Sequence, residues 1–260
     1  MSNTTSTQPS NPTPNPTLSL FIFIVLTTIY SFVQYNNGVN KLYFIIYILS
    51  VIIIQFFINL NLTKTLCGFN QWSIATIVTF IPWSVIFGIL FVLLSMFPGW
   101  LIPFSNTFGY GVALLAGIGN LMNNILEPNP KGNKNIKDSS MREALAHIYS
   151  DKSLLINEIT QTNFEYFWNN MKGVFKPGVY SNTNLKNQLL QMVNLKYIVS
   201  EYIWFILTGI LITSISFNYI VNIGCNQSAA EMKKRHDEYE NNLKTESQKP
   251  DNRRIYSSTE

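Results

Sequence analysis

Two long stretches of this 260-residue sequence carry almost no charged side chains. Residues 9–40 contain no Asp, Glu, Lys or Arg, and between residues 65 and 128 the only such residue is Glu127. Charged residues make up 12% of the chain, against about 25% in a soluble domain. Long uncharged stretches that alternate with polar ones are typical of membrane spans joined by loops in water. The sequence therefore predicts an all-α, polytopic integral membrane protein.

Four stretches are apolar and long enough to cross a bilayer as helices. Residues 17–97 are expected to hold three of them, and residues 198–223 form the last. In the second span, 42–60, 14 residues are Leu, Ile, Val or Phe, so insertion is favoured despite Gln55 and Asn59, which are expected to bond to a neighbouring helix. Pro82 is expected to kink the third span.

Residues 98–126 are the ambiguous part of the chain. Residues 101–126 are uncharged and long enough to cross the bilayer, but Pro103, four glycines and several asparagines make them a poor span. They fit a fifth transmembrane helix, a re-entrant element or a helix lying in the membrane interface. Because this composition disfavours unaided insertion, we predict four spans. An even number of spans places both termini on the same face of the membrane.

Residues 127–197 form a polar region with signals for three short helices, whose core is expected to be too small to stand without the membrane or a partner. Ser140 with Glu143, and Thr162 with Glu165, fit helix capping boxes. A third helix is expected to begin near Thr183 and run into the last span. One of the three carries an apolar stripe that is predicted to contact protein, within the chain or on a partner, rather than lipid: Phe164, Phe167, Trp168 and Met171.

The last span is rich in small and hydroxylated residues. Thr208, Gly209, Thr213 and Ser216 favour close helix–helix packing in lipid. A conduction path would use similar residues, but it normally includes a buried charge, and no predicted span centre holds one.

Catalytic and metal-binding patterns are lacking in the sequence. Glu143 and His147 lie four residues apart, but two ligands are too few for a zinc site, and His236 falls in a solvated run of charges. No phosphate-binding, dinucleotide-binding or hydrolase motif is present. We therefore expect no catalytic residues, no metal, no cofactor and no small-molecule substrate, and the net charge of +4 is too dispersed to indicate nucleic-acid binding.

The two cysteines, Cys67 and Cys225, exclude a disulfide-rich scaffold. With four spans they lie on the same side of the membrane. A disulfide between them is the less favoured alternative at this stage, because the sequence does not fix the spacing that such a bond needs.

Two segments resemble membrane proteins of nucleocytoplasmic large DNA viruses, which lie in the internal virion membrane under the capsid. They are FPGWLIPFSNTFGYG (97–111) and, behind the last span, SAAEMKKRHDEYE (228–240). The resemblance implies a non-enzymatic structural role that ties the membrane to the capsid shell or shapes the membrane. It carries no mechanistic motif, so it transfers no functional residues.

The sequence thus favours a structural membrane protein, located in a virion internal membrane or a host-cell endomembrane. Its expected partners are the lipid bilayer, other membrane or capsid proteins and, as an open alternative, a second copy of the chain. The rival functions are a small channel or transporter, and a membrane-bound assembly or trafficking factor. The expected organisation is a disordered tail (1–16), three spans (17–97), the ambiguous segment (98–126), a helical extramembrane region (127–197), the last span (198–223) and a polar C-terminal helix and tail (224–260).

Overall fold

The computed structural model describes residues 16–127, 146, 151–223, 225 and 229–247. Within these residues every regular element is a helix and none is a strand, which confirms the all-α prediction. The chain divides into two compact units that meet between Val221 and Asn222. The expected tail at 1–16, apart from Pro16, and the capping box of Ser140 and Glu143 lie outside the described residues.

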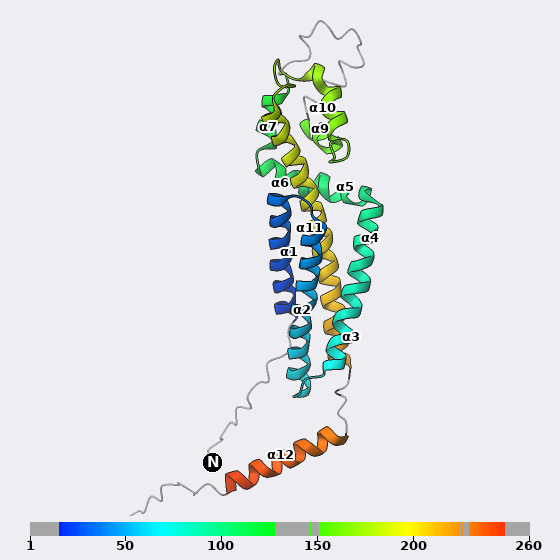
Figure 1. Ribbon diagram of the computed structural model, residues 1–260, viewed down its shortest axis with the longest axis vertical. Coiled ribbons are helices and arrows are strands. Elements are labelled where there is room, and N and C mark those ends of the chain that lie inside the picture. The colour runs from blue at the N-terminus through cyan, green and yellow to red at the C-terminus, as the bar shows by residue number, and fades with distance from the viewer. Residues whose placement is uncertain (1–15, 128–145, 147–150, 224, 226–228, 248–260) are drawn as a thin grey trace, which may run out of the picture. The chain divides into compact units, whose positions relative to one another are not determined.

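Four helices of the first unit are long and apolar enough to span a membrane, as predicted. They are α1 (Thr17–Asn37), α2 (Lys41–Cys67), the continuous helix Trp72–Met96 and α11 (Thr183–Asn222). Helix α2 begins at Asn40, whose side chain accepts a hydrogen bond from the Leu42 N–H, and it ends at Gly68 in the left-handed region. The chain turns back after each span, which builds an antiparallel bundle (Figure 1).

The third span absorbs its proline in a wider turn. It consists of α3 (Trp72–Pro82), a π-helical turn (Trp83–Phe87) and α4 (Gly88–Met96). Pro82 has no N–H to donate and its ring crowds the preceding turn, and the wider π-helical turn follows it directly. The expected disturbance at Pro82 is therefore a π-helical turn within a helix that continues to Met96.

The bundle has an aromatic core and is tied by hydrogen bonds between neighbouring helices. The Phe205 ring of α11 lies 4.9 Å from the Phe87 ring and 6.1 Å from the Tyr47 ring, centroid to centroid. Lipid offers no hydrophobic drive for helices to associate, so packing and polar contacts must hold them together. The core is formed by Phe23, Tyr30, Tyr47, Val51, Ile52, Trp83, Phe87, Leu90, Leu94, Leu101, Phe205 and Ile212.

The segment after α4 crosses the end of the bundle and then turns away from it (Figure 1). It comprises a 3-10 turn (Pro98–Leu101), α5 (Ile102–Phe104), a π-helical turn named η3 (Ser105–Gly109), α6 (Tyr110–Leu115) and α7 (Ile118–Ile125). The part up to Leu115 and the part from Ile118 meet at 83°. Gly117 makes this bend possible, because its φ of 97° lies in the left-handed region.

Helix α7 leaves the bundle and packs into a second core, formed with the first half of α11 and two short helices. These are α9 (Lys152–Glu158) and α10 (Phe164–Asn170), which is followed by a 3-10 turn (Met171–Val174). An isolated antiparallel bridge between Leu126 and Phe175 joins the segment that follows α7 to the segment that follows the 3-10 turn. We call these four packed elements the module; its buried residues are Ala113, Ile118, Leu121, Met122, Ile125, Leu126, Leu155, Ile156, Ile159, Phe164, Trp168, Phe175, Val179, Leu189 and Val193.

The module corrects the expectation that residues 127–197 need the membrane or a partner to complete their core. The missing apolar surface comes from α7, which the sequence analysis placed in a separate segment, and from the first half of α11. Helix α11 does begin at Thr183 and run on without a break, as predicted.

Asp151 starts α9 by accepting a hydrogen bond from the Ser153 N–H at 2.9 Å. Hydrogen bonds from the Ser153 side chain and backbone lower the pKa of this carboxyl below its ordinary value. A lowered folded-state pKa contributes stability that is present above the unfolded pKa and lost as the pH falls. We therefore expect α9 to fray first in acid, and Asp151→Asn, which keeps the cap, to remove this dependence in hydrogen-exchange measurements. Equal acid sensitivity in both proteins would contradict this.

The second unit contains α12 (Ala229–Ser247), whose described side chains are exposed. Pairs spaced four residues apart line it, among them Lys234 with Glu238 at 3.9 Å and His236 with Glu240 at 3.4 Å. Such exposed pairs add only a few tenths of a kcal/mol each. The helix that was predicted after the last span is present.

Candidate functional site

Helix α11 links the bundle to the module, and the most unusual side chain of the protein lies at this junction. Forty residues at about 1.5 Å each give about 60 Å, roughly twice the hydrocarbon thickness of a bilayer. Four residues on one stripe of its first half are buried: Leu189, Val193, Lys196 and Ser200. Three of them are expected in a core, and Lys196 is not.

The Lys196 side chain is 1% exposed and bonds only to neutral oxygens. Its Nζ donates to the Ile156 carbonyl at 2.7 Å, to Asn157 Oδ1 at 3.3 Å and to Asn106 Oδ1 at 3.4 Å. These three acceptors match the three protons of an ammonium group. No described carboxylate lies within ion-pair distance of Nζ, and Glu158 attracts it only through space.

The acceptors are held in place by α9 and by the π-helical turn η3. At the end of η3, Gly109 packs directly against α11. A Cβ there would lie 2.7 Å from the Lys196 backbone oxygen, closer than any real contact. The glycine therefore lets η3 approach α11 closely enough for Asn106 to reach the ammonium group.

The lysine also fixes the orientation of the two carboxamides. An ammonium group has only donors, so Asn106 and Asn157 must turn their oxygens toward it and their NH₂ groups away from it. Neither NH₂ group donates to any residue in the described part of the chain, yet no described polar side-chain atom is both buried and unsatisfied. The two NH₂ groups are therefore accessible donors.

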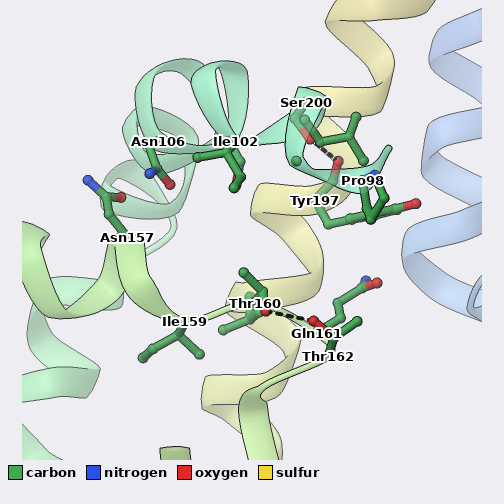
Figure 2. Close-up of a pocket in the computed structure, with 14 residues that line it drawn as sticks. Pro98, Ile102, Asn106, Asn157, Ile159, Thr160, Gln161, Thr162, Tyr197 and Ser200 are labelled. Atoms are coloured by element: carbon green, nitrogen blue, oxygen red, sulfur yellow. Dashed lines mark hydrogen bonds between the residues drawn. The ribbon is translucent and has the colours of Figure 1, made fainter. Parts of the chain in front are cut away.

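Both asparagines line a pocket of about 180 Å³ at the junction (Figure 2). One wall is the segment that crosses the bundle end, the second is the chain that follows α9, and the third is α11. Leu101, Ile102, Ile159 and Val193 give it apolar surface, and hydroxyl and amide groups of the same three walls give it polar surface. All of its lining side chains are uncharged. The two asparagines that line the pocket are the same ones whose carboxamide oxygens accept hydrogen bonds from the buried Lys196.

Sequence reasoning missed this site, although one signal was present. Lys196 falls on the same helical stripe as Leu189 and Val193, so helical periodicity alone places it toward the core. Asn106, Asn157 and Gly109 had no local signal of their own.

Two of the four packing residues predicted in the last span, Gly209 and Ser216, contact neighbouring helices. Gly209 is covered by the Phe23 ring of α1, and a Cβ on it would lie 2.0 Å from Phe23 Cε1. The Ser216 hydroxyl donates to the Val78 carbonyl of α3 at 2.7 Å. Thr213 is buried and bonds within its own helix, to the Gly209 carbonyl at 2.8 Å. Thr208 is half-buried.

The polar residues of the second span bond to neighbouring helices, as expected. The Gln55 side chain exchanges hydrogen bonds with Ser19 of α1, accepting from its hydroxyl and donating to its carbonyl. Asn59 Nδ2 donates to Thr79 Oγ1 of α3 at 2.8 Å. Inside a bilayer such side chains have no water to bond, so each interhelical bond also satisfies a group that would otherwise be unpaired.

The aromatic stripe of α10 faces the core of the module. Phe164 and Trp168 are almost fully buried in it, and Phe167 and Met171 pack against it partly buried. The Trp168 indole donates to the Tyr180 carbonyl at 3.4 Å. The sequence left open whether this stripe contacts its own chain or a partner. In the structure it packs in the core of its own chain, so it is not available as a docking surface for a partner.

Helices α1 and α11 run antiparallel, so the beginning of α1 lies beside the later part of α11. Near the start of α1, Phe23 meets Gly209, whereas near its end Gln34 donates to Glu201 at 3.1 Å. We therefore expect glycosylation reporters at residues 5 and 255 to report the same face of the membrane. Opposite faces would require an odd number of spans, with the crossing segment as the fifth.

Neither cysteine of the chain is free. Cys67 and Cys225 are both disulfide-bonded, which favours the alternative that the sequence analysis preferred less. Gln71 Nε2 additionally donates to Cys67 Sγ at 3.0 Å. Disulfides persist in oxidising compartments.

In the denatured, unreduced protein we therefore expect no labelling by a maleimide–polyethylene glycol reagent, and two adducts after reduction. The variant Cys67→Ser should label once without reduction, because the remaining sulfur has lost its partner. Two adducts on the unreduced parent protein would show that the cysteines are thiols.

The pair Glu143 and His147 lies outside the described residues, and His236 is an exposed member of an ion pair on α12. In the described part of the chain, no three His, Cys, Asp or Glu side chains gather as metal ligands would.

Comparison with known proteins adds no relative: no protein-family model, no curated protein and no solved structure matches this chain.

Proposed function

We propose that this protein is a non-enzymatic structural component of a virion membrane, which holds a folded module at the membrane surface and so ties the internal membrane to the capsid shell. The observation that carries the proposal is the continuous helix α11. Its first half belongs to the core of the module, and its second half packs in the bundle. A force on the module is therefore transmitted to the bundle through an unbroken helix and not through a loose linker.

Two further features support this role. The segment that crosses the bundle end presents apolar side chains outward, with Leu115 91% exposed and Trp100 45% exposed. Trp100 also stacks on Trp204 of α11 and accepts a hydrogen bond from its indole through the backbone carbonyl. Indole rings favour the headgroup level, so this segment is suited to lie in the membrane interface. The resemblance of residues 97–111 and 228–240 to giant-virus membrane proteins points to the virion.

The proposal is tested on purified particles that contain the protein. After a non-ionic detergent removes the membrane, we expect a fraction of the chain to remain with the capsid shells and to cross-link to shell proteins through the module. Complete extraction without any such cross-link would refute a membrane-to-shell tie. Presence during assembly but absence from mature particles would instead indicate an assembly factor.

The channel alternative is tested with the purified protein in liposomes. A structural role predicts ion flux no greater than that of protein-free liposomes. Saturable flux that depends on the protein would replace the structural proposal by a conduction function.

A further inference from the structure

The crossing segment, residues 98–116, exposes apolar side chains and no charged ones. It contains no Asp, Glu, Lys or Arg. The exposed Thr107 does not need water for its hydroxyl, because its Oγ1 donates to the Pro103 carbonyl at 2.7 Å. The large exposed side chains of the segment are Trp100, Ile102, Phe108, Val112, Leu114 and Leu115.

The exposed side chains change from apolar to polar at the bend made by Gly117. The exposed residues before the bend, on α6 and directly after it, are Val112, Leu114, Leu115 and Ala116. Those after the bend, on α7, are Asn120, Asn123 and Asn124. Two ammonium groups also bond to Asn123, that of Lys152 to its side-chain oxygen and that of Lys176 to its carbonyl. Amides and ammonium groups are costly in hydrocarbon, so α7 belongs in water.

Helix α11 shows the same change along its length and gives the depth at which it occurs. Its exposed residues between 183 and 191 are Thr, Asn and Gln, whereas those between 207 and 215 are Leu and Ile apart from Ser214. Gly109 of the crossing segment contacts α11 at Lys196. From there to the exposed Tyr219, α11 is about 35 Å long at about 1.5 Å per residue. A bilayer has about 30 Å of hydrocarbon and about 40–45 Å with its headgroups. With Tyr219 at one headgroup level, the crossing segment falls at the other.

The apolar surface of the crossing segment continues the surface that the spans present to lipid. Met96 and Phe97, at the end of the third span, are exposed and lead directly to the exposed Trp100. A protein partner would be expected to find a polar rim around an apolar contact, and this segment offers no charged side chain for one. Its continuity with the spans and its lack of charge both indicate lipid.

We propose that the crossing segment binds lipid in the headgroup and outer acyl region of one leaflet without crossing the bilayer, and that the boundary with water on this side falls at Gly117. The inference rests on the membrane placement in the proposed function, but not on attachment to a capsid. A segment that lies across the bundle end at this depth (Figure 1) opposes movement of the spans along the bilayer normal when the module is pulled.

The test compares three exposed leucines of the full chain in phosphatidylcholine liposomes, each replaced singly by cysteine and spin-labelled. Leu211 lies in the bundle half of α11, Leu115 in the crossing segment and Leu154 on α9 of the module. Because the native cysteines are disulfide-bonded, the label attaches to the new cysteine of the unreduced chain, and the parent protein gives the background. Each label is exposed to oxygen, which concentrates in hydrocarbon, and to a water-soluble nickel chelate on both sides of the membrane.

We expect the labels of Leu115→Cys and Leu211→Cys to collide more with oxygen than with the chelate, and the label of Leu154→Cys to show the reverse order. A fourth label, on Asn124→Cys, should behave as the Leu154→Cys label does, because Asn124 lies beyond the bend. All four side chains are exposed, so the substitutions should keep the fold, which an unchanged midpoint of thermal unfolding verifies.

A Leu115→Cys label as accessible to the chelate as the Leu154→Cys label would overturn the lipid-binding surface. An Asn124→Cys label that prefers oxygen would overturn the boundary at Gly117 and indicate a segment that enters the bilayer more deeply. Both results would leave the shell-attachment experiment unaffected. A Leu211→Cys label that prefers the chelate would instead remove the membrane placement on which this inference and the proposed function both depend.

Discussion

Trp168→Ala is expected to lower the free energy of unfolding of the module by about 3–5 kcal/mol, the usual cost of removing a large buried aromatic side chain. Trp168 is 2% exposed. Its ring lies 4.6 Å from the Phe175 ring and 6.2 Å from the Phe164 ring, between centroids. Trp168 belongs to the buried core of the module, and removing its ring leaves a cavity there.

The measurement is limited proteolysis and hydrogen exchange of residues 152–198 in detergent. We expect faster cleavage and exchange in the module, with membrane insertion unchanged, because the spans form a separate core. Tyr166→Ala is the matched control: it removes an aromatic ring from the same helix, but Tyr166 is 75% exposed. If Trp168→Ala resists protease as well as Tyr166→Ala does, the aromatic stripe contributes nothing to the module.

Gly209→Ala is expected to loosen the bundle itself, although it adds a single methyl group. That group would lie 2.0 Å from Cε1 of Phe23, whose ring is fully buried and lies 5.1 Å from the Trp83 ring, between centroids. Phe23 can yield only by displacing Trp83 or the α1 backbone. Overpacking of this kind costs about 1–3 kcal/mol and sometimes more, which thermal unfolding in detergent would show as a lower midpoint.

Two further variants isolate the cause. Gly88→Ala adds the same methyl group to α4, where it meets nothing within 4 Å, so it should be neutral or slightly stabilising through better helix propensity. Phe23→Leu in the Gly209→Ala background should recover part of the loss, because it shortens the side chain that clashes. A Gly209→Ala protein as stable as the parent would show that α1 and α11 do not pack closely.

The spans could be predicted from the sequence because the bilayer imposes a local rule. A segment that crosses hydrocarbon must satisfy its backbone within one helix and carry apolar side chains along about twenty residues. The predicted span 42–60 therefore falls inside α2, and the starting point of α11 near Thr183 came from the same kind of local pattern. Small residues such as Gly209 likewise predicted a close helix contact, but the sequence did not show that Phe23 would be the contacting residue.

The remaining features were decided by contacts between distant segments, which no local pattern encodes. Residues 101–126 were compatible with three placements. The bend at Gly117 sends α7 to the module, because only there does its apolar face meet α11 and α10. That addition closed a core that residues 127–197 could not have closed alone, and it turned the stripe of Trp168 inward.

Lys196 shows most clearly where prediction from the sequence alone ends. The sequence determined that it lies on the buried stripe of a helix, where a charge is costly. Only the tertiary structure brought Asn106, 90 residues away, and Ile156 and Asn157, 40 and 39 residues away, to its ammonium group. Helical periodicity is set by neighbours three and four residues apart, whereas the partners that make a buried charge tolerable are chosen by how whole helices pack.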